Sequence, residues 1–216
     1  MTTRAQSFLT PAEQEKITRC VQEAEKQTSG EIVPMIVSES HSYPLAVVGG
    51  ATFLSLPTAL LAAHLLGTTF WIGPDSMWLF LACFILLYCI TYPLVQNISW
   101  LKRRFLLPSR AEEEVKAGAV RAFFNEGLYR TSAKNGILLY ISVFEHRVWI
   151  LADSGINEKI DEGRWQEIVD TVTSGIRNKR QGEAICEAIT EIGTILKDFY
   201  PYTKEDRDEL HNLIIT

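Results

Sequence analysis

A cluster of acidic residues follows the last apolar run that is predicted to form a strand. Asp153 ends the run RVWILAD (147–153), and Glu158 and Asp161 follow in the loop SGINEKIDEGR, close to Asn157. Carboxylate and amide oxygens are the ligands that Ca²⁺ and Mg²⁺ prefer. In open α/β sheets, ligands bind outside the carboxyl ends of the strands. These residues therefore predict a divalent-cation site, and with it a metal-dependent phosphomonoesterase.

The same acidic residues also have a purely structural interpretation. Glu158 and Asp161 precede a predicted helix, where carboxylates cap amide groups and complement the helix dipole. Asp153 can cap the loop that it begins. Glu31 and Asn135 join the site only if strand pairing brings them to the same edge. Because serine–histidine–aspartate sets and phosphate-binding loops are absent from the sequence, the residues leave open whether the protein is an enzyme, and no cofactor follows with certainty.

A long uncharged segment separates the first strand-like run from the rest of the chain. Between Ser42 and Leu101, Asp75 is the only residue with a formal charge. Two stretches, 44–66 and 77–95, have the roughly 20 mostly apolar residues that one membrane span needs. A soluble helix pair has a polar face, and these stretches have none. The segment therefore predicts a transmembrane hairpin, with the lipid bilayer as a partner.

Charged and aromatic residues at the ends of the two stretches predict how the hairpin is oriented. Lys102, Arg103 and Arg104 follow the second stretch, and the connecting loop carries no cation. The positive-inside rule then places both termini in the cytoplasm, so we expect a two-span protein of the cell inner membrane. Aromatic rings that suit the headgroup region flank both spans: Tyr43, Trp71, Trp78, Tyr92 and Trp100.

Composition limits the other partners. The chain carries a formal net charge of -5 at pH 7, which argues against nucleic acid as a partner. Its cysteines match no zinc or disulfide spacing. Cys20 and Cys186 fall in predicted helices, and we expect them to be reduced, buried thiols, as in a cytoplasmic domain.

Capping and periodicity patterns predict a small sheet covered by helices. Thr10, Pro11 and Glu13 begin the first helix with a capping box. Strands are expected at 31–37, 136–143 and 147–153, and Pro34 asks for an edge position or a bulge in the first of them. Later helices are expected from Ser109, around Trp165 and over 184–196, with a short amphipathic helix at Leu210, Leu213 and Ile214. The fold class is α/β, an α/β/α sandwich with a small mixed sheet interrupted by the hairpin.

The soluble part also resembles a known family. The segments SGEIVPMIV, NGILLYISV and RVWILADSGI are similar to the TPM domain family, named for thylakoid and membrane proteins, in the variant with a transmembrane hairpin inside the domain. The resemblance implies an α/β/α sandwich. It divides the chain into the first part of the domain (1–41), the hairpin (42–101), the remainder (102–201) and an amphipathic tail (202–216).

What the family does differs between its members, and the resemblance implies two functions. Thylakoid relatives resemble photosystem repair factors with acid phosphatase activity, and animal relatives resemble accessory subunits of receptors. Commoner members have a loop like V-G-x-G-x-E, where this chain has Asp153 and Ser154 at the first positions. We therefore expect an accessory or interaction protein for other membrane proteins. The alternative is a weak acid-phosphatase-like hydrolase; transport is disfavoured because two helices offer no substrate path.

Overall fold

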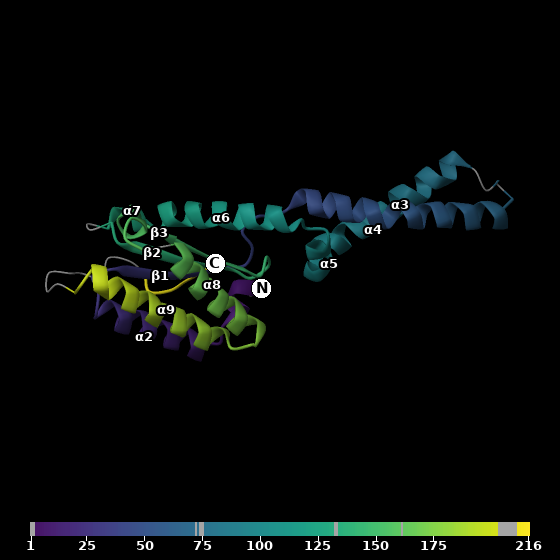
Figure 1. The fold of residues 1–216 in the computed structure, drawn as a ribbon. Coiled ribbons are helices and arrows are strands. Elements are labelled where there is room, and N and C mark those ends of the chain that lie inside the picture. Colours follow the sequence, from purple (N-terminus) through teal and green to yellow (C-terminus); the bar gives the residue numbers. More distant parts are fainter. Residues whose placement is uncertain (1–2, 72, 74–75, 132–133, 161, 203–210) are drawn as a thin grey trace. The chain divides into compact units, whose positions relative to one another are not determined.

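The computed structural model describes residues 3–71, 73, 76–131, 134–160, 162–202 and 211–216. The chain divides into two compact units, one made of Met1–His41 with Glu112–Thr216 and the other of Ser42–Ala111. The first unit is a mixed α/β domain and the second is a helical hairpin (Figure 1). In chain order the elements are α1 (Arg4–Phe8), α2 (Pro11–Glu25), β1 (Glu31–Val37), α3 (Pro44–Thr69), α4 (Met77–Asn97), α5 (Ser99–Arg104), α6 (Pro108–Asn125), η1 (Leu128–Arg130), β2 (Gly136–Ser142), β3 (Arg147–Ala152), α7 (Ser154–Asn157), α8 (Glu162–Arg177), α9 (Gln181–Phe199) and β4 (Ile214–Ile215).

The strands of the α/β domain form a mixed sheet in the order β3-β2-β1-β4. β1 runs parallel to β2 and to β4, whereas β3 runs antiparallel to β2. Figure 1 shows α6 over one face of this sheet and α2, α8 and α9 over the other. Every residue of β1 and β2 is buried, as expected for strands covered on both faces. The predicted α/β/α sandwich is confirmed.

The larger core lies between the sheet and the three helices α2, α8 and α9. Its fully buried members include Ile32 of β1, Leu139 of β2 and Ile189 of α9. On the other face, α6 contributes Val115 and Ala119 to a smaller core. The first helix begins as the sequence predicts, because Thr10 Oγ1 accepts from the backbone N–H of Glu13 and the Glu13 carboxylate accepts from that of Thr10.

Pro34 lies in β1, which has neighbours on both sides, and the pairing explains why it is tolerated. The β1 amides alternate in direction: Glu31 N–H points to β2, and Ile32 N–H points away from it and donates to Glu25 Oε1 at 3.1 Å. Pro34 therefore shares the direction of Ile32. β4 pairs with Met35 and Ile36, and within the described residues no strand opposite Pro34 requires the N–H that proline lacks.

Three expectations about local structure are wrong. The helix expected from Ser109 begins at Pro108, which favours the first helical position, so Ser109 lies inside α6 rather than at its cap. The loop after β3 contains a short helix, α7, because Asp153 caps it. Ile214, expected in a helix, belongs to strand β4, since β1 offers it an open edge; Leu210 lies outside the described residues.

The hairpin unit consists of α3 and α4 followed by α5. Small side chains on one side of α3, namely Ala51, Ser55 and Ala59, are fully buried. Thr91 of α4 reaches this side and donates to the Ala51 carbonyl at 3.4 Å. Such small residues allow two helices to approach closely. Both α3 and α4 are long and apolar enough to cross a membrane.

Candidate functional site

Asp153 follows β3 and caps α7. Its Oδ1 accepts hydrogen bonds from the backbone N–H of Ser154 at 2.6 Å and from the Ser154 hydroxyl at 3.1 Å. Its other oxygen, Oδ2, is buried and has no hydrogen-bond partner among the described residues. The structural interpretation of this carboxylate as a cap is therefore realised for one of its two oxygens.

The other predicted ligands are not brought into a set with Asp153. Glu158 is exposed, and the Asn157 amide donates to the Ala152 carbonyl at 2.8 Å. Asp161 lies outside the described residues. Within the part of the chain that the structure describes, no group of three or more His, Cys, Asp or Glu side chains is placed to hold a metal ion. The cation site stays a prediction.

The direction of β3 decides which edge of the sheet Asp153 occupies. Because β3 is antiparallel to β2, its carboxyl end lies at the amino ends of β1 and β2. The Asp153 N–H accordingly donates to the carbonyl of Gly136 at 2.9 Å, and Glu31 N–H donates to that of Asn135 at 3.2 Å. Glu31 and Asn135 thus do share an edge with Asp153. That edge is opposite to the carboxyl ends of the parallel strands, where ligands bind in open sheets.

A hydrogen-bond network occupies the carboxyl ends of β1 and β2, and sequence reasoning missed it. Ser40 follows β1, Ser142 ends β2, and Glu145 lies in the turn to β3. The Ser40 N–H donates to Glu145 Oε1 at 2.9 Å, and the Ser40 hydroxyl donates to Ser142 Oγ at 3.0 Å. The Ser142 hydroxyl in turn donates to Glu145 Oε2. Glu145 is only 4% exposed, so these donors hold a carboxylate inside the domain.

Tyr140 and α6 close this network on one side. The Tyr140 hydroxyl lies 3.3 Å from Ser40 Oγ, and Arg121 of α6 donates to the Ser40 carbonyl at 3.4 Å. Gly118 of α6 leaves room for the Tyr140 hydroxyl, because a Cβ at this position would lie only 2.7 Å from it. Burial raises the pKa of Tyr140 above its ordinary value of 10.0, the nearby Glu145 carboxylate raises it further, and the Ser40 hydrogen bond opposes the shift.

The raised pKa of Tyr140 predicts a loss of stability in alkali. A phenol whose folded-state pKa exceeds its unfolded-state value contributes stability that is complete below the unfolded value and disappears as the pH rises through the folded one. The free energy of unfolding should therefore fall as the pH rises above about 10. Tyr140→Phe should remove this part of the fall, measured by urea unfolding at pH 8 and pH 11. An equal fall in both proteins would contradict the assignment.

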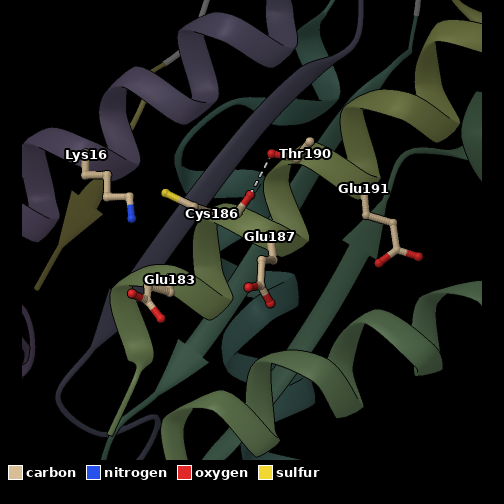
Figure 2. Close-up of a pocket in the computed structure, with 6 residues that line it drawn as sticks. All are labelled: Lys16, Glu183, Cys186, Glu187, Thr190 and Glu191. Atoms are coloured by element: carbon tan, nitrogen blue, oxygen red, sulfur yellow. Dashed lines mark hydrogen bonds between the residues drawn. The ribbon is translucent and has the colours of Figure 1, made fainter.

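A shallow groove of about 540 Å³ runs along α9 and reaches Lys16 of α2. Figure 2 shows Lys16 facing the side chain of Cys186, with Thr190 on the next turn donating to the Cys186 carbonyl at 2.9 Å. Cys186 forms a disulfide with Cys20 of α2. The expectation of two reduced thiols is therefore wrong. Sequence spacing could not reveal the pair, because the two cysteines meet only where α2 and α9 pack together.

Several of the residues expected to set the membrane orientation lie at the base of the hairpin unit. Lys102 is buried, and its ammonium lies 5.8 Å from the centre of the Tyr43 ring. Arg103 and Arg104 belong to the same short helix, α5, and are exposed. Of the aromatic residues expected near headgroups, Tyr92 is half-buried. Three tryptophans are strongly exposed: Trp71, Trp78 and Trp100.

Comparison with known proteins finds one family model in part of this chain. Residues 105–195 match the family model described as the TPM domain. The chain carries a TPM domain. The match includes β2, β3 and Asp153, while β1 and β4, which lie outside it, complete the sheet.

A solved structure shares the fold. The NMR structure of the BA42 protein from the psychrophilic bacterium Bizionia argentinensis sp. nov. has a TM-score of 0.59 with this chain, at 20% sequence identity. The similarity covers 96% of this chain and 94% of the other. At this identity it shows the fold. No curated protein matches the chain in sequence.

Proposed function

We propose that this protein is anchored in the bacterial inner membrane by the α3–α4 hairpin and presents its TPM domain at the cytoplasmic face as an accessory protein for another membrane protein. The observation that carries the proposal is the position of the hairpin in the chain. It is inserted between β1 and β2, which pair directly with each other. The chain therefore leaves one central strand of the sheet for the anchor and returns, through α5 and α6, to the other central strand.

Large apolar side chains on the outside of the hairpin support the membrane anchor. Leu60 and Leu61 of α3 and Ile85, Leu86 and Ile90 of α4 are all exposed. In a bilayer, lipid chains would cover these side chains, whereas in solution the side chains would be exposed to water. The small residues of α3 face inward, as in helix pairs packed within a bilayer.

Two observations give opposite expectations for the side of the membrane on which the TPM domain lies. The cations of α5 favour the cytoplasm, whereas a disulfide is typical of an oxidising compartment. We propose the cytoplasm, where the disulfides that do occur are usually transient or redox-sensing. Reporter enzymes fused at Gly73 and at Thr216 test this: Gly73 should read as external and Thr216 as cytoplasmic, and the reverse pattern would overturn the proposed orientation.

An exposed aromatic cluster on the TPM domain supports a protein partner. Phe124 of α6 is 57% exposed and Tyr129 is 41% exposed, and their ring centres lie 5.3 Å apart. Arg130 lies over the Tyr129 ring, and its Nε donates to the Tyr129 hydroxyl at 2.9 Å. Aromatic and arginine side chains of this kind dominate the binding energy of protein interfaces. We propose this aromatic cluster as the partner-binding surface.

Site-specific photocrosslinking in cells tests the proposed surface. A photoreactive phenylalanine at position 124 should give a defined crosslinked product with a membrane protein. The matched control is the same substitution at Phe199, an aromatic residue of α9 that is 43% exposed. Crosslinks at Phe124 no stronger than those at Phe199 would count against the accessory function.

We propose a divalent-metal-dependent phosphomonoesterase as the second candidate function, and one observation favours it. The buried Oδ2 of Asp153 has no hydrogen-bond partner among the described residues. Ca²⁺ or Mg²⁺ would bind such a carboxylate oxygen. The purified protein should then hydrolyse a phosphomonoester in the presence of either cation, and Asp153→Asn should abolish this turnover. Turnover unchanged by Asp153→Asn, or no turnover with either cation, would reject this candidate.

A further inference from the structure

The helices α2 and α9 approach each other closely along their length, and glycines of α9 permit this. A Cβ at Gly182 would lie 2.7 Å from Glu13 Cγ, and a Cβ at Gly193 would lie 2.8 Å from Ala24 Cβ. Cys186 lies between these glycines. Its Cα is 5.7 Å from that of Cys20, a separation that a disulfide bridges without backbone movement.

The disulfide joins the two parts of the chain that the hairpin separates. Cys20 lies before the hairpin and Cys186 after it, at a sequence separation of 166 residues. The segment between them contains all of α3 and α4 as well as three strands of the sheet. The bond therefore holds the first part of the TPM domain covalently to the last part.

One cysteine of the pair borders the groove. Cys186 is only 7% exposed, but it lines the groove together with Lys16 and Thr190, and Cys20 is half-buried. Lys16 precedes Cys20 by one turn of α2, so its ammonium lies on the side of the helix that carries the Cys20 sulfur. We propose that Cys20–Cys186 is a thiol–disulfide exchange site, at which a dithiol reductant attacks Cys186 from the groove. The proposal depends neither on the partner protein nor on the orientation of the hairpin.

The exchange balances in two steps. A thiolate of the dithiol attacks Cys186 Sγ, an S–S bond forms between them, and the Cys186–Cys20 bond breaks with Cys20 leaving as a thiolate. The Lys16 ammonium stabilises this leaving group, and a lower leaving-group pKa speeds exchange. The second thiolate of the reductant then displaces Cys186. The reductant becomes a cyclic disulfide, and the protein gains two electrons and, with two protons from water, two thiols.

The charges of the groove select the reductant. Glu183, Glu187 and Glu191 line it on successive turns of α9. Arg180 lies 3.7 Å from Glu183, so Glu187 and Glu191 provide the negative charge that opposes anions. A thiol with a neighbouring cation should therefore react faster than a thiol with a neighbouring anion.

The test uses the full chain in detergent with Cys83 and Cys89, the two other cysteines, replaced by alanine. Thiols are counted by a mass-tagging maleimide after denaturation. Protein treated with a mild oxidant should carry no tag, and after dithiothreitol it should carry two. Cysteamine (cationic) and mercaptoethanesulfonate (anionic) are then compared by their rates of reduction. The double variant Glu187→Gln/Glu191→Gln should lower the ratio of the cysteamine rate to the mercaptoethanesulfonate rate about threefold at low salt. The intrinsic reactivities of the two thiols cancel when this ratio is compared with that of the protein that keeps both glutamates.

Three results would overturn the proposal. Two tags in the oxidised protein would mean that the disulfide does not form. A reduction rate that does not depend on thiol concentration would mean that the bond is reached only by unfolding and not from the groove. An unchanged rate ratio in the glutamine variant would remove the selection by charge.

Discussion

Replacing residues 42–107 with a six-residue glycine–serine linker should give a TPM domain that stays in solution without detergent. The reason is the place where the chain leaves the domain and re-enters it. Ser40 lies beside α6, since a Cβ on Gly118 would be 3.3 Å from Ser40 Cβ. Pro108 precedes Gly118 by ten residues, which is about 15 Å along a helix. The six-residue linker and His41 together span up to about 23 Å, which is more than this distance along the helix.

Cell fractionation and circular dichroism measure the result. The full chain should sediment with membranes, and the linker variant should remain in the supernatant with a cooperative thermal transition. A two-residue linker is the matched control: together with His41 it spans about 10 Å, too short to connect β1 to the start of α6, and it should give no folded domain. A six-residue variant that still sediments with membranes would show that membrane binding does not depend on α3 and α4.

Those parts of the fold that depend on local patterns could be predicted from the sequence. The capping box at Thr10 and Glu13, the buried strand at Glu31–Val37 and the long apolar helices α3 and α4 are signalled by residues close together in the chain. The edge position predicted from Pro34 is wrong, because β1 lies between β2 and β4 in the sheet; Pro34 is tolerated there since β4 begins to pair only at Met35.

What sequence reasoning missed depends on contacts between distant segments. The edge assigned to Asp153 is wrong because only the pairing of β3 with β2 fixes its direction. The disulfide of Cys20 and Cys186 follows from the packing of α2 on α9. Ile214 forms a strand because β1 has an open edge beside it. The network around Ser40 left one local signal, the polar run Ser38–Ser42 directly after a buried strand, but its carboxylate comes from the turn after β2.

Glu145→Ala should destabilise the TPM domain by about 3 kcal/mol. The substitution leaves the half-buried Ser40 N–H and the buried Ser142 hydroxyl without the carboxylate that accepts their hydrogen bonds. Each unsatisfied buried donor costs about 1–3 kcal/mol. Urea unfolding followed by tryptophan fluorescence measures the change, since Trp149 and Trp165 pack on the two cores of this domain.

Two control variants separate the loss of these acceptors from a general loss of charge. Glu145→Gln keeps a carbonyl oxygen for the Ser40 N–H, so its loss should be about half that of the alanine variant or less. Glu158→Ala removes an exposed carboxylate and should change stability by no more than about 0.5 kcal/mol. Equal losses for Glu145→Ala and Glu158→Ala would contradict a structural role for the network. A loss of stability at Glu145 alone would mean that its buried carboxylate holds Ser40 in place. Ser40 lies between β1 and the hairpin, so this hydrogen bond would fix the segment through which the sheet continues into the anchor.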